Sequence, residues 1–474
     1  MLTVSKTRQR MGPIFLLVVA TLALWLASKW YYQDWFVNPY KYVAKAASLT
    51  TTVLMCGAVM LATRWGFLER FFGGLDKVYQ VHKRIGRWSF FIILLHPVFL
   101  ALDRLPDVVA FLLAMWLKQP EGDRYLWGQN VGVVAFMGFA LLVALTLWVK
   151  ISYNRWKRTH EFFGLVLLIV GVHIFVVNAD VARYPLLAVW LYGLLGLALI
   201  SFVYIRFLYR RWGPRFDYYV WGIERIGDIL EVTFAPQDQK MDFRPGQFVY
   251  LVIRKEGITP EPHPYSIASG YNLEARLKLG IKQLGDHTRT LDRLQVGDPV
   301  TLYGPYGHFC DAFLRADRDC VFVGAGIGIT PFIGMWHVAL HSEERYDQNE
   351  VPTPIRKLHP EILKTWKSPK VSLFYVCRTF EEASFDNDIR HEVILSQFHG
   401  FPQLEKRGHH YELYLSSRQG RISATYLDRQ APGGLKDKYI FLCGPTPMVN
   451  DLIQQFEALG LDSSQIVVED FNFL

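Results

Sequence analysis

The segment KVYQVHKRIGRWSFFIILLHPVF (77–99) places two histidines in an apolar run long enough to enter a lipid bilayer. A second segment, KRTHEFFGLVLLIVGVHIFVV (157–177), repeats this arrangement with a nearly equal spacing. The histidines of the two segments are His82, His96, His160 and His173. Imidazoles are rare in lipid-embedded helices, where a polar side chain is by default a candidate for function. The two segments therefore predict a membrane domain that holds a functional site.

The spacing of these histidines indicates what kind of group they hold. They are 14 positions apart in the first segment and 13 in the second, which separates the paired imidazoles by roughly 20 Å along a helix. That distance would hold one flat cofactor near each face of a hydrocarbon core about 30 Å thick. If the segments pack side by side, His82 faces His160 and His96 faces His173, and each pair offers two imidazoles to one haem iron. Helix packing would better explain a single histidine, but four at matching depths favour two haem sites.

Helical phase supports the first pair and leaves the second open. Fourteen steps of 100° return the second imidazole to within about 40° of the first, whereas thirteen steps leave it about 140° away. Gly164 and Gly171 lie between the histidines of the second segment. A kink there, or the close approach of a neighbouring helix, would change the alignment.

The first 210 residues contain six apolar runs, which predict six membrane-spanning helices. They cover approximately residues 13–27, 46–62, 87–102, 131–149, 162–177 and 186–204. Basic residues gather at 64–87, 150–158 and 206–215, and the positive-inside rule places these connections in the cytosol. We therefore expect a multi-pass protein of the cell membrane (inner or plasma), with both termini cytosolic. The same rule accounts for the net charge of +8, so we expect no nucleic-acid partner.

The remaining chain has the pattern of a soluble α/β protein. Short alternating strands such as ILEVTFAP (229–236) and PVTLYGP (299–305) predict a small antiparallel barrel. Farther on, strands such as VSLFYVCR (371–378) alternate with helical stretches and predict a parallel sheet. The expected fold is a multidomain membrane protein: a six-helix transmembrane bundle, then an antiparallel β-barrel domain, then an α/β parallel-sheet nucleotide-binding domain. The expected boundaries are 1–210, 215–312 and 318–474.

A glycine-rich stretch, VFVGAGIGITPF (321–332), runs from an apolar strand through a turn into a helix start. Its glycines would let the backbone approach a pyrophosphate, whose charge a helix N-terminus favours. Such turns also occur for packing reasons. A later strand, however, ends in YIFLCGPTPM (439–448) and would reach the carboxyl edge of the same sheet, where α/β sheets bind ligands. The chain's five cysteines form no CxxC pair, so a reduced, cytosolic setting suits this half.

Five motifs carry a resemblance to known proteins. They are EPHPYSIAS (261–269), GDHTRTL (285–291), GPYGHF (304–309), GAGIGITPF (324–332) and CGPTPM (443–448). In this order they resemble the flavin and nicotinamide modules of the ferredoxin-reductase superfamily. With the six apolar runs and the histidine pairs, residues 45–474 resemble the transmembrane NADPH oxidase and ferric reductase superfamily. His-Pro precedes Tyr-Ser here, where soluble ferredoxin reductases usually have Arg-x-Tyr-Ser, and this departure favours the membrane branch.

The resemblance implies cofactor contacts at matching positions. FAD would contact His263, Pro264, Tyr265 and Ser266 along its isoalloxazine, and Gly285, His287 and Thr288 near its pyrophosphate. NADPH would contact Gly324, Gly326, Gly328, Thr330, Pro331, Gly444 and Pro445.

Two side chains are implied at the reacting rings. Cys443 would touch the nicotinamide, although a free cysteine also packs as a small apolar residue. Phe473 would cover the flavin until the nicotinamide displaces it, with Phe471 as the alternative.

Arginines after the strands of the second sheet favour NADPH over NADH. Arg378 stands where an NAD enzyme would have an acid for the ribose 2′-hydroxyl, and Arg418 and Arg421 follow the next strand. Guanidinium groups there can make charge-assisted hydrogen bonds to a 2′-phosphate. The alternative at each position is an ordinary solvated arginine that binds no phosphate.

The resemblance and the histidine pairs together predict a transmembrane oxidoreductase. Its cofactors would be FAD, NADPH and two haems of the b type, and electrons would leave the cytosolic NADPH for an external acceptor. Dioxygen, reduced to superoxide, is the first choice, which would make the chain an NADPH oxidase. Oxygen-reducing members often have a second histidine where this chain has Leu100, so a ferric-chelate reductase and a relay to a periplasmic or membrane partner remain alternatives. The sequence contains no calcium-binding loop, and no regulatory subunit is predicted.

Overall fold

A computed structural model describes residues 11–35, 38–107, 109, 123–151, 153–177, 180–270, 276–341, 368–398 and 402–469. The chain divides into two compact units, which are described separately. One consists of residues 9–72 and 77–210, and the other is built mainly from residues 211–474.

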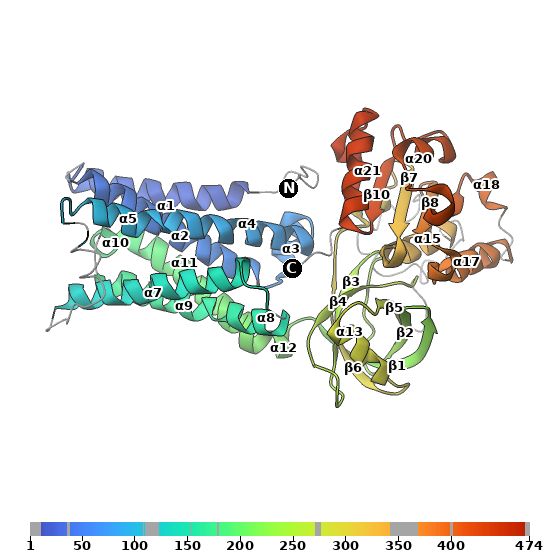
Figure 1. The fold of residues 1–474 in the computed structure, drawn as a ribbon, viewed down its shortest axis with the longest axis horizontal. Coiled ribbons are helices and arrows are strands. Elements are labelled where there is room, and N and C mark those ends of the chain that lie inside the picture. Colours follow the sequence, from blue (N-terminus) through green and yellow to red (C-terminus); the bar gives the residue numbers. More distant parts are fainter. Residues whose placement is uncertain are drawn as a thin grey trace. The chain divides into compact units, whose positions relative to one another are not determined.

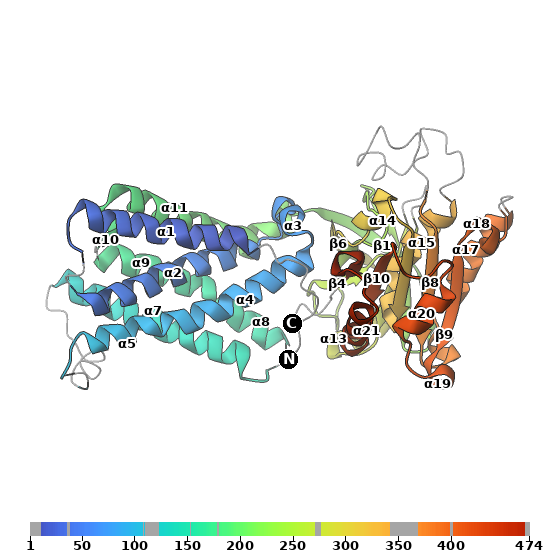
Figure 2. The same cartoon turned by 90° about the horizontal axis from the view of Figure 1, so that it is seen from above.

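The first unit is a helical bundle whose helices run side by side in both views (Figures 1 and 2). The helices are α1 (Gly12–Tyr31), α2 (Pro39–Leu61), α3 (Gly66–Phe72), α4 (Leu75–Ile93), α5 (Leu95–Leu102), α7 (Arg124–Leu147), α8 (Tyr153–Glu161), α9 (Phe163–Val177), α10 (Asp180–Arg183), α11 (Pro185–Val203) and α12 (Tyr209–Trp212). Six helical stretches within the described residues are long and apolar enough to cross a membrane, which confirms the expected number. They exceed the predicted apolar runs because their ends carry charged residues that a hydropathy reading leaves out.

The bundle is apolar inside and outside. Its interior is formed by side chains such as Val53, Leu167 and Leu191, all nearly inaccessible. Large apolar side chains, among them Phe15 and Val189, are exposed on its surface. A protein in water would not leave so many apolar groups exposed, whereas lipid chains solvate them. The chain is thus a multi-pass membrane protein.

Two of the spans are interrupted between their histidines. The third span consists of α4 and α5, which are separated at Leu94, and the fifth consists of α8 and α9, separated at Phe162. Near the second interruption, Gly164 faces the ring of Phe202 on α11 so closely that a Cβ atom could not fit. The span that carries His160 in α8 and His173 in α9 is therefore not one uninterrupted helix, which the calculation of helical phase assumed.

The second unit begins with a six-stranded antiparallel sheet. Its strands are β1 (Arg215–Ile226), β2 (Ile229–Pro236), β3 (Phe248–Ile253), β4 (His263–Ser266), β5 (Leu277–Lys282) and β6 (Pro299–Tyr306), in the order β4-β3-β6-β1-β2-β5. A bridge between Ile267 and Leu279 joins the two edges, so the sheet curls around a core that includes Tyr218, Val232 and Leu302. The short helices α13 (Asp286–Thr290) and α14 (Asp311–Arg315) flank β6 in sequence. This agrees with the expected barrel-like domain.

The unit continues with a parallel sheet of five strands. They are β7 (Cys320–Ala325), β8 (Val371–Cys377), β9 (His410–Leu415), β10 (Tyr439–Cys443) and β11 (Ile466–Val468), in the order β11-β10-β7-β8-β9. Two apolar clusters cover its faces, one packed by α15 (Thr330–His341) and α17 (Asp386–Phe398), the other by α20 (Ala424–Gln430) and α21 (Thr446–Ala458). The shorter helices α18 (Leu404–Arg407) and α19 (Ser416–Gln419) lie on either side of β9 in sequence. The expected α/β architecture is confirmed.

Candidate functional site

The structure brings the histidines of the membrane unit together in the predicted pairs. The ring centres of His82 and His160 are 5.9 Å apart, and His96 and His173 are close enough to interact electrostatically. Two imidazoles on opposite sides of one metal ion, with bonds of about 2 Å, would have ring centres roughly 6 Å apart. The His82–His160 pair thus has about the ring separation of two imidazoles that share one metal ion.

Backbone carbonyls of α2 fix the orientation of two of these imidazoles. His82 Nδ1 lies 2.9 Å from the carbonyl oxygen of Ala58, and His96 Nδ1 lies 2.8 Å from that of Ala44. A carbonyl oxygen only accepts, so each Nδ1 carries the proton and donates it. Each Nε2 is left with a free lone pair, which is the tautomer that binds a metal. The two carbonyls are 14 positions apart on α2, the same spacing as the two histidines that they hold.

The other two histidines, one from each pair, are held differently. His173 Nδ1 donates to the carbonyl oxygen of Gly128 on α7 at 2.8 Å. Its ring lies against Gly132, where a Cβ atom would be 2.5 Å from Cε1. His160 Nδ1 is buried and has no hydrogen-bond partner among the described residues. Its ring instead stacks on Trp156, with centres 5.0 Å apart and planes 27° apart. Three imidazoles are therefore oriented by hydrogen bonds and the fourth by aromatic packing.

A charged network occupies the end of the bundle at which α1 ends and α2 begins. Asp180 Oδ2 accepts from Lys45 Nζ at 2.7 Å and from Trp25 Nε1 at 2.9 Å, while Lys29 Nζ lies 2.9 Å from Asp180 Oδ1. Burial alone would raise the pKa of Asp180, but these three donors lower it to about 2. Lys45 follows Ala44, the residue whose carbonyl holds His96, so the network stabilises the chain next to one histidine pair.

In the sheet of the second unit, two of the predicted flavin motifs meet. The rings of His263 on β4 and His287 on α13 stack with centres 3.8 Å apart and planes 21° apart. His287 Nδ1 is also 2.9 Å from Thr259 Oγ1. The segments HPYS and GDHT, separated by about twenty residues in sequence, therefore form one surface.

The polar groups of this surface are partly unsatisfied. The Tyr265 hydroxyl is buried and has no hydrogen-bond partner among the described residues, and burial raises its pKa. Ser266 is buried beside it on β4. The Thr288 hydroxyl accepts from the backbone N–H groups of Leu284 and Gly285 at 3.1 and 3.0 Å. A buried orphan hydroxyl is costly, which is consistent with a place where a polar ligand belongs.

The nucleotide motifs also meet, at the carboxyl edge of the parallel sheet. Gly324 pairs with Cys443 across β7 and β10. Gly328 lies so close to the carbonyl of Cys443 and to Gly444 that a side chain would collide with them, and Gly326 has a left-handed φ of +54°. Thr330 and Pro331 begin α15, and the Thr330 hydroxyl donates to the Ile327 carbonyl oxygen at 2.9 Å. The Cys443 thiol is buried, with the residue 2% exposed.

The arginines predicted to select NADPH lie at that same edge. Arg378 follows β8 and Arg418 lies on α19, which follows β9. β8 and β9 are neighbouring parallel strands, and the Ser417 N–H donates to the Arg378 carbonyl oxygen at 3.1 Å. Both guanidinium groups belong to exposed residues. Phe471 and Phe473 lie outside the described residues.

The antiparallel sheet is joined to α17, which packs on the parallel sheet, by a partly buried chain of ion pairs. Lys278 Nζ on β5 lies 3.1 Å from Glu231 on β2 and 2.9 Å from Asp388 on α17. Burial raises the pKa of Glu231 to about 7, although Lys278 opposes this shift. Close by, Gly334 on α15 faces the Ser269 carbonyl oxygen without room for a side chain. The flavin and nucleotide surfaces are thus parts of one packed unit.

Sequence reasoning missed several of these contributors. The carbonyls of Ala44, Ala58 and Gly128 leave no trace in a side-chain pattern, because any residue has one. The glycine pair Gly128 and Gly132 on one helix face was a usable signal, since four-residue spacing marks a close helix approach.

Comparison with known protein families separates the two units. Residues 47–171 match the family described as "Ferric reductase like transmembrane component", and residues 220–308 match an "FAD-binding domain" family. The first range contains His82, His96 and His160, and it ends two residues before His173. The second contains the strands and motifs of the flavin surface up to His308.

The individual proteins that resemble this chain have low sequence identity to it. The chain is 24% identical over 263 residues to the ferredoxin reductase component of the 3-ketosteroid-9-alpha-monooxygenase from Rhodococcus rhodochrous, covering 53% of this chain and 63% of that protein. It is 28% identical over 253 residues to the glycine betaine monooxygenase reductase subunit of Pseudomonas aeruginosa, covering 52% and 62%. The chain thus spans less than two thirds of the length of these curated relatives.

A solved structure with bound FAD and haem, the flavohaemoglobin of Malassezia yamatoensis, is 16% identical with a TM-score of 0.45, covering 91% of this chain and 97% of that one.

The two family matches lie in one chain together with six candidate spans, an antiparallel sheet and a parallel sheet. This chain belongs to the transmembrane NADPH oxidase and ferric reductase superfamily.

Proposed function

We propose that the chain is an NADPH oxidase, which carries electrons from cytosolic NADPH through FAD and two b-type haems to dioxygen and releases superoxide. The observation that carries this proposal is the orientation of the histidine pairs, joined in one chain to an FAD-binding domain. One NADPH supplies two electrons, so it converts two dioxygen molecules to two superoxide ions and leaves NADP⁺ and one proton.

The histidines fit haem ligation by their chemistry. His82 and His160 would hold one haem, and His96 and His173 the other. Three of the four have Nδ1 bonded to a carbonyl oxygen, which directs Nε2 toward a metal and raises its basicity. Haem iron with two axial imidazoles exchanges single electrons. The role of this chain is to hold the four ring planes in place and to exclude water from them.

The second unit would supply the electrons. FAD takes a hydride from a nicotinamide and gives up electrons singly. The stacked His263 and His287 and the orphan Tyr265 hydroxyl would contact the flavin. The glycine turn at 324–328 would receive the pyrophosphate of NADPH, and Arg378 with Arg418 would bind its 2′-phosphate. The buried Cys443 and the C-terminal Phe473 are our candidates for contacts at the nicotinamide.

The direction of transfer follows from charge. Basic residues gather at the connections that we place in the cytosol, and the chain passes directly from α12 into β1. The second unit would therefore lie on the cytosolic side, with both termini, and the His82–His160 pair would be the inner one. The protein would reside in the cell (inner or plasma) membrane.

The acceptor is proposed from the outer charges. Reduction of a ferric chelate would be favoured by free acidic groups there. Asp103, however, accepts from Asn38 and pairs with Lys41 at 3.3 Å. Asp123 accepts from the Tyr125 N–H at 2.8 Å as the N-cap of α7, although both it and Asp107 are exposed. Dioxygen is small and uncharged and needs only access to the haem edge.

One comparison tests this function. Purified protein with FAD and NADPH should reduce cytochrome c in a manner that superoxide dismutase suppresses, and should do so faster than it reduces a ferric chelate without oxygen. Rapid iron reduction with no superoxide would instead support a ferric reductase. Failure of both, with the haems reduced by NADPH, would support a relay to a protein partner.

A further inference from the structure

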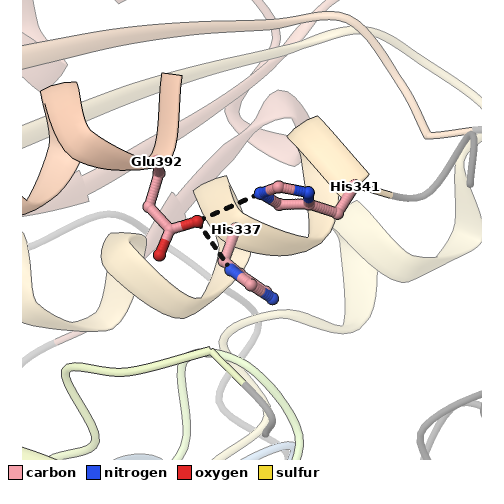
Figure 3. Close-up of side chains that lie close together, drawn as sticks. All are labelled: His337, His341 and Glu392. Atoms are coloured by element: carbon pink, nitrogen blue, oxygen red, sulfur yellow. Dashed lines mark hydrogen bonds and ion pairs between the residues drawn. The ribbon is translucent and has the colours of Figure 1, made fainter. Parts of the chain in front are cut away.

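Two histidines and a glutamate of the nucleotide-binding part form a cluster that none of the cofactors above uses. His337 and His341 lie on α15, and Glu392 lies on α17 (Figure 3). One nitrogen of each imidazole and one oxygen of the carboxylate all lie within 4.8 Å of one another. We propose that these three side chains bind a divalent transition-metal ion of the zinc class, which fastens α15 to α17.

The spacing on α15 makes the two imidazoles neighbours. Residues four apart on a helix lie one turn apart on the same face, and the two rings have centres 4.7 Å apart. Figure 3 shows both rings directed toward the carboxylate, which comes from a different helix. The fold therefore brings together ligands that are 51 and 55 positions apart in sequence.

The two distances from the carboxylate to the imidazoles are close to those of a zinc site. Glu392 Oε2 is 2.8 Å from His337 Nδ1 and 3.1 Å from His341 Nε2. Two tetrahedral ligands at zinc bond lengths of about 2.0–2.1 Å lie roughly 3.3 Å from each other. Entry of the ion would therefore widen these contacts by a few tenths of an ångström. The carboxylate oxygen that now accepts from both rings would bind the metal in place of their protons.

The surroundings hold the ligands in place and leave a way in. His341 is buried, while the side chains of His337 and Glu392 are 25% and 23% exposed. On the side of the antiparallel sheet, the backbone at Gly270 lies against the His337 ring and leaves no room for a Cβ atom. The Glu392 carboxylate accepts from both imidazoles, which holds its oxygen between the two rings.

The ligand set selects the class of ion. Imidazole suits zinc and its neighbours in the first transition row, whereas magnesium and calcium prefer oxygen ligands. Three protein ligands leave a fourth position for water. The site is at the far end of the helix that begins beside the nucleotide turn at Thr330, so the ion would stiffen that helix without touching the hydride. This inference depends on neither the haems nor the proposed acceptor.

A zinc-binding measurement tests the proposal. The full-length protein, purified in detergent with FAD bound and stripped of metal by a chelator, is dialysed against buffered free Zn²⁺, and its zinc is counted by mass spectrometry. Wild type should hold about one equivalent more than Glu392→Gln or His341→Gln. Each variant should bind zinc more weakly by a factor of roughly 10 to 100 or more, because loss of a group that only supports a metal ligand already has an effect of that size. His391→Gln, which alters the exposed residue next to Glu392, is the matched control and should bind like wild type.

Melting curves separate a metal site from an ion-pair cluster. Zn²⁺ should raise the melting temperature of wild type and of His391→Gln but not of Glu392→Gln, and Mg²⁺ should have no effect. FAD content verifies that each variant is folded. Equal zinc binding by wild type and both ligand variants would overturn the proposal. The proposal would also be overturned if the melting temperature of Glu392→Gln lay below that of wild type by the same amount with and without zinc.

Discussion

Replacing Gly132 by alanine is expected to remove the haem that we propose between His96 and His173, while the haem proposed between His82 and His160 stays bound. The added Cβ atom would lie 2.5 Å from His173 Cε1 and 2.7 Å from Nδ1, whereas ordinary contacts begin near 3.4 Å. The imidazole would have to retreat by roughly 0.9 Å to relieve the overlap. An N–H···O bond is normally restricted to about 2.7–3.2 Å, so the 2.8 Å bond to the Gly128 carbonyl oxygen would not survive such a shift.

The magnitude follows from what that bond does. Losing a partner that orients a metal-bound histidine costs about 10- to 100-fold in affinity, which corresponds to roughly 1.4–2.8 kcal/mol. Displacement of the ring itself adds to this loss. The three atoms nearest to the added Cβ all belong to His173, so the proposed haem content should fall from two per chain to about one. The remaining haem should show the spectrum of a bis-histidine centre.

The matched control is Gly171→Ala, on the same helix as His173. A Cβ atom there would meet nothing within 4 Å, and alanine is favoured over glycine inside a helix by about 0.5–1 kcal/mol. This variant should keep both haems. Haem is measured per chain after denaturation and by reduced-minus-oxidised spectra. The reasoning would be refuted if Gly132→Ala kept both haems, or if Gly171→Ala lost as much haem as Gly132→Ala.

Three further outcomes are expected. Arg378→Ala combined with Arg418→Ala should raise KM for NADPH by roughly ten- to a hundredfold, since hydrogen bonds to charged groups contribute about 1.5–3 kcal/mol; an equal rise for NADH would contradict the assignment. The pKa of Glu231 is raised to about 7 from 4.5, so the free energy of unfolding should fall by about 3 kcal/mol as the pH rises from 4.5 to 7. In Glu231→Gln the melting temperature should change less over that pH range than in wild type. Asp180, with its pKa lowered to about 2 from 3.8, contributes about 2 kcal/mol above pH 4 that is lost toward pH 2. Asp180→Asn should therefore melt lower at pH 7, whereas Asp107→Asn, at an exposed residue, should not.

The parts predictable from sequence are those that repetitive side-chain patterns specify. Six apolar runs gave six spans, and the alternating and buried strands gave the two sheets. The ends of the spans were less predictable, because helical backbone continues into charged residues beyond the apolar run. The glycine turn was correctly expected to meet the end of a later strand, since parallel strands share one carboxyl edge. The structure adds the reason for Gly328, which is contact with the Cys443 carbonyl.

The parts that sequence could not supply depend on tertiary contacts. The interruption at Phe162 separates the helices that carry His160 and His173, and no local signal places it there rather than at Gly171. The pair His337 and His341 has a visible four-residue spacing, but Glu392 reaches it only because α17 packs on α15. A pattern along the chain records which residues share a face. It does not record which faces meet.

The packing of α2 shows how one contact between helices can orient histidines of two sites. Its carbonyls at Ala44 and Ala58 hold His96 and His82, and the matching 14-residue spacings mean that one alignment of α2 with the span formed by α4 and α5 satisfies both bonds. A slip by a helical turn would break both bonds together, so the two pairs are not independent of each other. The side chains at these alanines take no part, and substitutions there would act only by changing how closely the helices pack. His160, which lacks such a carbonyl and rests on Trp156, is the one ligand outside the control of hydrogen bonds. We therefore expect the inner site to depend on aromatic packing in a way that the outer site does not.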